Sequence, residues 1–240
     1  MKKIKKKFWN FKKINNKTGE LMLYGEIANE TWWGDEVTPK DFKKELDNLG
    51  DIDTLNVYIN SPGGDVFAGQ AIHSMLKRHK AHVNVYIDGL AASIASVVAM
   101  AGDKVIMPKN AMMMIHNPWT IAIGNAEDFR KLADDLDQIR ESIVEAYKRK
   151  TILDEDKIKE LMDNETWLTA EECKEYGFAD ELEEEKEIAA SINTNMLSKY
   201  KNTPKEIFES LIKTKEKAKK NDDKEKINKL KAKLALELEL

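Results

Sequence analysis

The stretch LNVYINSPGGDVFAGQAI, residues 55–72, joins a strand pattern to a helix pattern through a glycine turn. Leu55–Asn60 is short and rich in aromatic and β-branched residues, which is typical of a strand. After the turn, apolar residues recur with the spacing of one helical face, at Ala68, Ile72 and Leu76. A strand followed at once by a helix is the building unit of an α/β domain, and we expect that fold class here.

The alternation of strands and helices extends from Leu21 to about Asp180. Further strands are predicted over residues 82–88, 104–108 and 111–116. A long helix is predicted after Gly124, with Asn125 as its cap. One side of this helix is apolar; its members are Phe129, Leu132, Ala133, Leu136, Ile139, Ile143 and Tyr147.

A last core helix is predicted to open with the capping box TAEE, in which Thr169 and Glu172 cap each other's backbone. Gly177 suits the left-handed turn that ends such a helix. After this helix the composition changes to lysine and glutamate with almost no aromatic residues. We therefore divide the chain into a basic N-terminal segment (1–20), a folded domain (21–187) and a charged C-terminal extension (188–240), which we expect to be helical or partly disordered.

Composition and charge exclude several classes of protein. The 240 residues are 42% apolar and 34% charged, enough for one domain with a real core. A formal net charge of −4 gives no reason to expect nucleic acid as a partner. No apolar stretch of a signal peptide follows the N-terminal lysines, so we do not expect secretion by that route. We interpret these lysines as a solvated, mobile tail in preference to a nucleic-acid or membrane patch. The longest apolar run, Leu90–Gly102, is too short to span a bilayer, which needs about 20 residues.

A single cysteine, Cys173, excludes an intramolecular disulfide and suits a reducing cytosol. In the final helix it is most simply a small buried hydrophobe and not a nucleophile. Together these features predict a cytoplasmic protein that does not enter the membrane.

The glycine turn after the first quoted strand can do more than reverse the chain. Pro62 fixes one backbone dihedral, while Gly63 and Gly64 allow backbone that other residues resist. Such a turn can aim bare N–H groups at an anion near a helix N-terminus. By itself the motif is a weak signal, because most such turns are only tight turns.

One serine stands among small residues in IDGLAASIASVVAMAG, residues 87–102. Ser93 is expected in the first turn of a helix, at the carboxyl edge of the sheet, where α/β folds place their sites. Small neighbours leave room beside its hydroxyl. On this stretch alone, a closely packed small-residue helix is the preferred interpretation.

A nucleophilic serine needs a base, and the chain has four histidines. His116 ends an apolar strand and is followed by an irregular loop, so it can reach a pocket. The other three, at positions 73, 79 and 82, fall on or beside the helix after the glycine turn, and we interpret them as surface residues. No further ligands at metal-site spacing accompany them, and we predict no metal.

Four motifs in order, YINSPGGDVFAGQAI, GLAASIAS, MMIHNP and ETWLTAEECKEYGFAD, closely resemble the ClpP family of self-compartmentalised serine proteases. The resemblance covers about Leu21 to Asp180. It implies a ClpP/crotonase-like fold of repeated strand–strand–helix units and a serine endopeptidase that needs no cofactor.

The resemblance also implies roles for individual residues. Ser93 matches the nucleophile and His116 the catalytic histidine. The backbone N–H groups of Gly64 and Ile94 match the oxyanion hole, with Gly63 in the supporting turn.

The third member of the triad is where this sequence departs from the family. The family usually has an aspartate two residues before the aromatic-Leu/Met-Ser/Thr-Ala segment, and here Glu165 precedes WLTA. Glutamate can also orient a histidine. Asp163 is the nearby alternative, so the identity of the acid stays open between these two residues.

A second resemblance narrows the biology. Residues 8–39 and the charged extension resemble the phage-type branch, the head maturation or prohead proteases of tailed phages. The family implies a homo-oligomeric ring, commonly two stacked heptamers, and protein or peptide substrates such as capsid or scaffold proteins. A separate AAA+ unfoldase is the partner that would use ATP, and the expected location is the bacterial cytoplasm, including the prohead.

Three alternatives remain weaker. Crotonase-like enzymes of acyl-CoA thioesters share the glycine-rich oxyanion hole, but they do not need a serine with a distant histidine. A Ser/Lys membrane peptidase is disfavoured because no membrane segment is evident. A catalytically silent capsid-assembly scaffold would show a broken serine or histidine, and neither is broken.

Overall fold

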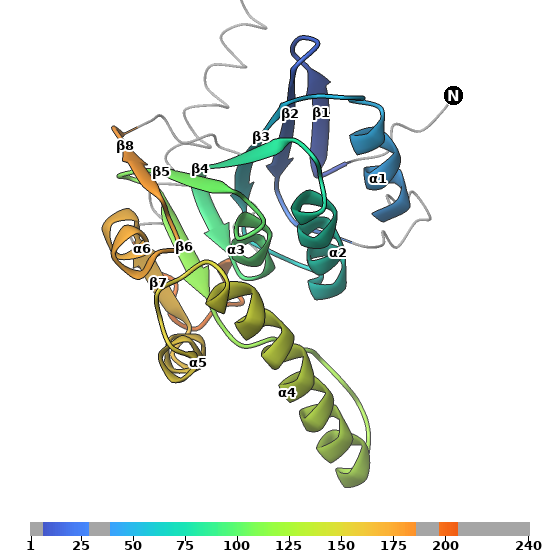
Figure 1. The fold of residues 1–240 in the computed structure, drawn as a ribbon. Helices are drawn as coiled ribbons and strands as arrows, with labels where there is room; N and C mark the ends of the chain where they lie inside the picture. The colour runs from blue at the N-terminus through green and yellow to red at the C-terminus, as the bar shows by residue number, and fades with distance from the viewer. Residues whose placement is uncertain (1–6, 29–38, 186–196, 206–240) are drawn as a thin grey trace, which may run out of the picture.

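The computed structural model describes residues 7–28, 39–185 and 197–205 as an α/β fold in which helices pack on a central sheet (Figure 1). The strands are β1 Trp9–Lys13, β2 Thr18–Tyr24, β3 Thr54–Ser61, β4 His82–Ala92, β5 Lys104–Pro108, β6 Met112–Ile115, β7 Thr166–Thr169 and β8 Glu181–Glu183. The helices are α1 Pro39–Asp47, α2 Val66–Lys77, α3 Ile94–Ala99, α4 Ala126–Lys148, α5 Glu155–Asp163 and α6 Ala170–Tyr176.

The sheet is mostly parallel, with the order β1-β2-β3-β4-β5-β8 and with β6 lying between β4 and β7. Only the β1–β2 and β6–β7 pairs are antiparallel among the described strands. Strand β4 changes partner along its length: residues 84–86 pair with β5, and residues 90–92 pair with β6. The predicted strand over residues 82–88 therefore continues to Ala92, because its second half joins a different neighbour. The end of this longer strand carries Ser93.

The predicted helix ends are confirmed. The Asn125 side chain caps α4 in a reciprocal capping box with Asp128, and Thr169 and Glu172 do the same for α6. Gly177 ends α6 in the left-handed conformation, with φ 84°. These local hydrogen bonds satisfy N–H groups that have no acceptor inside the helix.

The predicted apolar side of α4 is buried only in part. The buried residues of this helix are Ile143, Val144 and Tyr147, all near its C-terminal end. Phe129 is 49% exposed. Figure 1 shows that the N-terminal half of α4 projects away from the sheet.

The basic N-terminal segment also differs from expectation. Residues 9–13 form an edge strand, and β2 crosses the expected boundary at residue 20 without a break. Trp9 and Phe11 lie edge-on to Phe42 of α1, with ring centroids 5.4 and 5.0 Å apart. Aromatic packing therefore fixes this segment although three of the five residues of β1 are lysine or asparagine.

Of the expected C-terminal extension, the structure describes residues 197–205 alone, so the expected helical or disordered character of the rest lies outside the described residues. Within the described ranges, no helix is both long and apolar enough to cross a membrane.

Candidate active site

Ser93 lies at the junction between β4 and α3, in an unusual backbone conformation. Its φ is 55° and its ψ −131°, in a region that residues with a side chain rarely adopt. Its N–H donates to the carbonyl of Met114 on β6 at 2.8 Å, which ties the junction to the neighbouring strand. Such strain costs about 1–3 kcal/mol and is concentrated at functional sites.

His116 follows the last residue of β6 and lies against this serine. Its Nε2 is 2.7 Å from Ser93 Oγ, and the side chain is buried, with the residue 9% exposed. Burial lowers the pKa of His116 to about 4, and the negative charge of Glu165 acts in the opposite direction. The imidazole is therefore neutral at neutral pH and can accept the serine proton.

Glu165 and Asp163 are separated by the structure. The β6–β7 pairing ends at Ile115 and Thr166, and His116 and Glu165 are the next residues beyond these paired ends. Glu165 has a φ of 47°, and its charge acts on the pKa of His116. Asp163 instead accepts hydrogen bonds from Asn117 and Arg140, each at 2.7 Å. Glu165 thus lies close enough to His116 for its charge to act on the imidazole, whereas Asp163 belongs to a surface ion pair.

The glycine turn packs directly on Ser93. A side chain at Gly63, whose φ is 92°, would put its Cβ 2.6 Å from Ser93 Cβ. A Cβ at Gly64 would lie 2.0 Å from the carbonyl oxygen of Ile27. Ser61 Oγ accepts from the Gly63 N–H at 3.1 Å, which fixes the start of the turn. Only glycine fits at both positions.

Ile94 is the first residue of α3, so its N–H has no intrahelical acceptor and faces the N-terminal end of the helix. Helix α2 holds it in place: a Cβ at Gly69 would lie 2.2 Å from Ile94 Cγ1. The Gly64 and Ile94 amides thus belong to the two segments that flank Ser93.

Sequence reasoning missed a support beneath the serine. Ser96 Oγ donates to the carbonyl of Ser93 at 2.5 Å and lies 2.8 Å from the hydroxyl of Tyr147. Tyr147 is fully buried near the end of α4, and burial raises its pKa. The spacing of Ser96 from Ser93 was visible in the sequence, but its partner is 51 residues further along the chain.

A second missed residue is Tyr200. Its ring centroid lies 5.2 Å from that of His116 in an edge-on arrangement, and the residue is 6% exposed. No local pattern in its lysine-rich segment predicted a buried contact.

A cavity of about 680 Å³ begins at Gly64 and extends between α2 and α4. Its lining is largely apolar and includes Val66, Phe67, Trp119 and Ile139. It opens beside the glycine turn, where a side chain next to a bond attacked by Ser93 would need space. A pocket of this size suits one large side chain or a short peptide.

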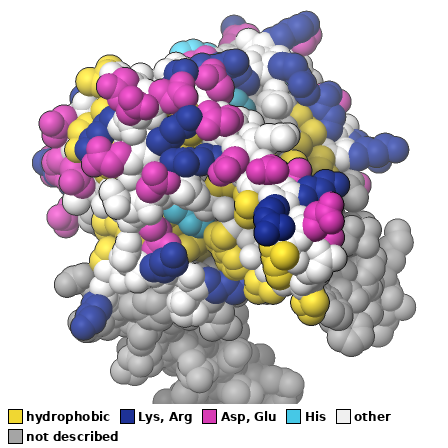
Figure 2. Space-filling model, turned by 90° about the horizontal axis from the view of Figure 1, so that it is seen from below, with side chains coloured by type: hydrophobic (Ala, Val, Ile, Leu, Met, Phe, Trp, Pro, Cys, Tyr) yellow, Lys and Arg dark blue, Asp and Glu magenta, His cyan; other side chains and the backbone are white. Residues whose placement is uncertain are grey.

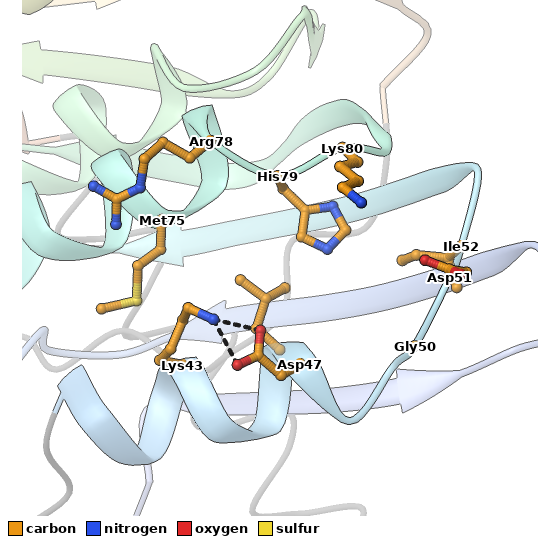
Figure 3. A pocket seen from close by; sticks show the side chains of 10 residues that line it. Lys43, Asp47, Gly50, Asp51, Ile52, Met75, Arg78, His79 and Lys80 are labelled. Atoms are coloured by element: carbon orange, nitrogen blue, oxygen red, sulfur yellow. Dashed lines mark hydrogen bonds and ion pairs between the residues drawn. The ribbon is translucent and has the colours of Figure 1, made fainter.

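A second cavity, of about 540 Å³, lies between α1 and α2 (Figure 3). Cationic side chains including Arg78 and Lys80 line it, and Lys43 is paired there with Asp47 at 2.5 Å. His79 is at its edge, where the ring nitrogen Nδ1 accepts from the Ala81 N–H at 3.1 Å. None of the predicted catalytic residues lies in this cavity.

Large apolar side chains are exposed on and beside the projecting part of α4. Ile121 and Ile123 are 87% and 103% exposed, and Phe67 is 63% exposed. Figure 2 views the molecule from the side to which α4 projects and shows hydrophobic side chains gathered among charged ones. Exposed apolar groups at this density mark an interaction surface.

The remaining sequence candidates lie elsewhere. Burial raises the pKa of the Cys173 thiol, which is buried in α6, so it is a poor nucleophile. In the described ranges no three His, Cys, Asp or Glu side chains are grouped as metal ligands would be.

Known proteins match the part of the chain that carries these residues. The model of the family described as Clp protease matches residues 39–186. The ATP-dependent Clp protease proteolytic subunit of Deinococcus radiodurans is 34% identical over 140 residues, covering 57% of this chain and 68% of that protein. The ATP-dependent Clp protease proteolytic subunit 1 of Salinibacter ruber is 32% identical over 155 residues, covering 62% and 66%.

A solved structure, of a ClpP1 mutant from Listeria monocytogenes, superimposes with a TM-score of 0.59 at 30% identity. The match covers 69% of this chain and 91% of that one. The predicted α/β fold of the ClpP type is thereby confirmed.

Proposed function

The chain belongs to the Clp protease family, and on that premise we propose that it is a serine endopeptidase with Ser93 as nucleophile, His116 as general base and Glu165 as the orienting acid. The observation that carries the proposal is the 2.7 Å hydrogen bond between Ser93 Oγ and His116 Nε2, made by a serine in a strained conformation at a strand–helix junction. Nucleophile and base within hydrogen-bond reach are the signature of covalent catalysis.

The chemistry follows from the positions of these groups. His116 Nε2 takes the hydroxyl proton as Ser93 Oγ attacks the carbonyl carbon of a peptide. The Gly64 and Ile94 N–H groups hold the resulting oxyanion, each donor contributing about 3–4 kcal/mol in comparable sites. His116 then gives its proton to the leaving amine, and water hydrolyses the acyl-enzyme by the same route.

Glu165 is the proposed acid because it follows directly beyond the Ile115–Thr166 pair, as His116 does on the other strand, and because its charge acts to raise the pKa of that imidazole. A negative charge there stabilises the imidazolium that forms during attack. Asp163 is excluded from this role in our proposal, because its carboxylate is paired with Arg140.

The cavity beside Gly64 is the proposed site for a substrate side chain. Its apolar lining, with Phe67 and Trp119, favours peptides that carry a large hydrophobic residue next to the cleaved bond.

We further propose that the protein forms a homo-oligomeric ring of seven subunits, either alone or as two stacked rings. Family membership supports this ring. It is also supported by three exposed apolar side chains, Ile121 and Ile123 just before α4 and Phe129 in its projecting part. The relatives' description as ATP-dependent proteolytic subunits supports an AAA+ unfoldase as a partner.

The narrower proposal is a role in phage capsid maturation, supported by the resemblance of residues 8–39 to head maturation proteases. Capsid and scaffold precursors should then be trimmed by the wild-type protein and left intact by Ser93→Ala. If the wild-type protein cleaves other proteins but neither precursor, the capsid role is wrong and the protein is a general protease.

No observation favours the acyl-CoA alternative, which gives the Ser93–His116 hydrogen bond no role. A silent scaffold equally leaves unexplained why both side chains are intact and in contact.

The test is covalent labelling with a fluorophosphonate, followed to its end point and mapped by tryptic mass spectrometry. We expect the adduct on Ser93, no adduct in Ser93→Ala or His116→Ala, and a rate lower by roughly 10²–10⁴ in Glu165→Ala. Asp163→Ala is the matched control, a carboxylate two residues away, and should label within about threefold of wild type, because an exposed ion pair contributes little. An assembled wild-type protein that is never labelled at Ser93 would contradict the proposal.

A further inference from the structure

A short segment from the C-terminal part of the chain lies on the proposed catalytic residues. This segment, residues 197–205, is called the tail segment below. It is anchored by Leu197, which is fully buried, and by Tyr200. Both residues pack in a small apolar cluster with Leu90, Ala92 and Met114, at the ends of β4 and β6.

The side chain of Tyr200 reaches the nucleophile itself. Its hydroxyl donates to the carbonyl of Pro62, just before the glycine turn, at 2.5 Å. Burial raises the pKa of Tyr200 to about 12, and a hydrogen bond with the Ser93 side chain acts in the opposite direction. The phenol therefore lies against the glycine turn and beside His116, next to Ser93.

The backbone of the tail segment reaches the proposed acid. The N–H of Asn202 donates to Glu165 Oε1 at 2.6 Å, and its side-chain amide donates to the carbonyl of Asn164 at 2.8 Å. Thr203 Oγ1 donates to the carbonyl of Leu197 at 2.8 Å, which closes the segment into a compact turn. The segment thus contacts the nucleophile, the histidine and the acid together.

The tail segment also reaches the rim of the apolar cavity. Lys199 Nζ lies 6.0 Å from the ring centroid of Trp119, a residue of the cavity lining. A peptide carbonyl must come within about 3–3.5 Å of the attacking oxygen to react. The Tyr200 phenol, held against Pro62 and His116, lies where such a carbonyl would approach, so we expect substrate and tail segment to compete for this space.

We propose that the tail segment is an intramolecular inhibitor, held in the substrate site by Tyr200 and Asn202, and that the enzyme becomes reactive when the segment is displaced. The inference rests on the proposed function, since an inhibitor needs a site to block. The occupant of the surface made by Pro62, Ser93 and Glu165 is residues 197–205 of this same chain.

The test compares initial rates of fluorophosphonate labelling for full-length wild type, Tyr200→Ala and Tyr200→Phe. Tyr200→Ala empties the site and should label at least about tenfold faster, as expected when a favoured closed state is lost. Tyr200→Phe removes only the hydroxyl bonds to Pro62 and Ser93 and should give a smaller increase. Lys201→Ala, an exposed neighbour in the same segment, is the matched control and should label at the wild-type rate.

A free peptide with the sequence LSKYKNTPK, residues 197–205, shows whether Tyr200→Ala keeps an intact site that the segment can bind. Added to Tyr200→Ala, it should slow labelling towards the wild-type rate, and LSKAKNTPK should not. Equal initial rates for wild type and Tyr200→Ala would overturn the inhibitory role of the tail segment and would leave the proposed protease function standing. Absence of labelling in every variant would instead overturn the proposed function. Intact mass that shows cleavage within 197–205 in wild type, and not in Ser93→Ala, would make the segment a substrate and overturn inhibition.

Discussion

Gly69→Ala tests whether α2 sets the position of the proposed oxyanion hole. In an ordinary helix this change gains about 1 kcal/mol of stability. Here the new Cβ would lie 2.2 Å from Ile94 Cγ1, a side chain that is 2% exposed and has no room to move. Overpacking of this severity costs about 3 kcal/mol, so we expect a net loss of about 2 kcal/mol in the free energy of unfolding.

The measurement is urea unfolding of wild type, Gly69→Ala, Ile94→Ala and the double variant. Ile94→Ala removes the atom that the new methyl group meets, so Gly69→Ala should be neutral or slightly stabilising in that background. The coupling energy between the two changes should be about 2–3 kcal/mol. Ala71→Gly, on the same helix, calibrates the helix propensity term and should cost about 1 kcal/mol.

The same variant should affect reactivity, because displacing Ile94 moves its N–H away from the place where the oxyanion forms. Removing one such donor costs about 10²–10³ in rate, so a displaced donor should slow Ser93 labelling about tenfold. If Gly69→Ala is stabilised by about 1 kcal/mol and labels normally, the close approach of α2 to α3 is not as described and the reasoning is refuted.

Three further outcomes are expected. Burial lowers the pKa of His116 from its ordinary value of 6.5 to about 4, so the unfolded state binds more protons between these values. The free energy of unfolding should therefore fall by about 3 kcal/mol as the pH drops through that window. Urea unfolding of His116→Gln should lack this component, and an identical pH dependence in the variant would count against it. Tyr147→Phe loses the contact with Ser96 and should cost about 1 kcal/mol in the same assay, with labelling nearly unchanged; a large loss of labelling would give Tyr147 a catalytic role instead. Ile123→Asp, at a fully exposed position, should leave the unfolding of the subunit unchanged and weaken self-association in sedimentation velocity; unaltered assembly would remove this residue from the interface.

Local patterns in the sequence were sufficient for the elements around the site. The strand at 104–108 and the caps at Asn125 and Thr169 depend on neighbouring residues, and the structure confirms them. The full length of β4 was not predictable in the same way. Its last residues pair with β6, a contact between segments more than 20 residues apart that leaves no periodic signal.

The sequence of α4 predicted its apolar side but not which part of that side is buried. Periodicity reports which residues avoid water, but not whether the cover comes from the same chain or from another. The confinement of the buried residues to the C-terminal end of α4 therefore needed the three-dimensional structure.

The candidate triad could be predicted in part. Ser93 and His116 were singled out by their positions at element ends and by the family motifs, and the structure brings their side chains together. The proposed choice of Glu165 over Asp163 rests on contacts that one-dimensional spacing does not contain, namely the ion pair of Asp163 with Arg140 and the action of the Glu165 charge on His116. Tyr200 lies beyond every motif, so only the three-dimensional contacts could reveal it.

Helix α4 connects the exposed apolar surface to the residues that support Ser93. Its 23 residues span about 35 Å, with Ile121 and Ile123 just before its free end and Tyr147, the partner of Ser96, at its buried base. A neighbouring subunit that binds the N-terminal end of α4 can therefore shift the whole helix, including Tyr147 and its contact with Ser96, one helical turn after Ser93. We expect the specific activity of this protein to change with its concentration, because subunit association and the alignment of the serine share the same helix.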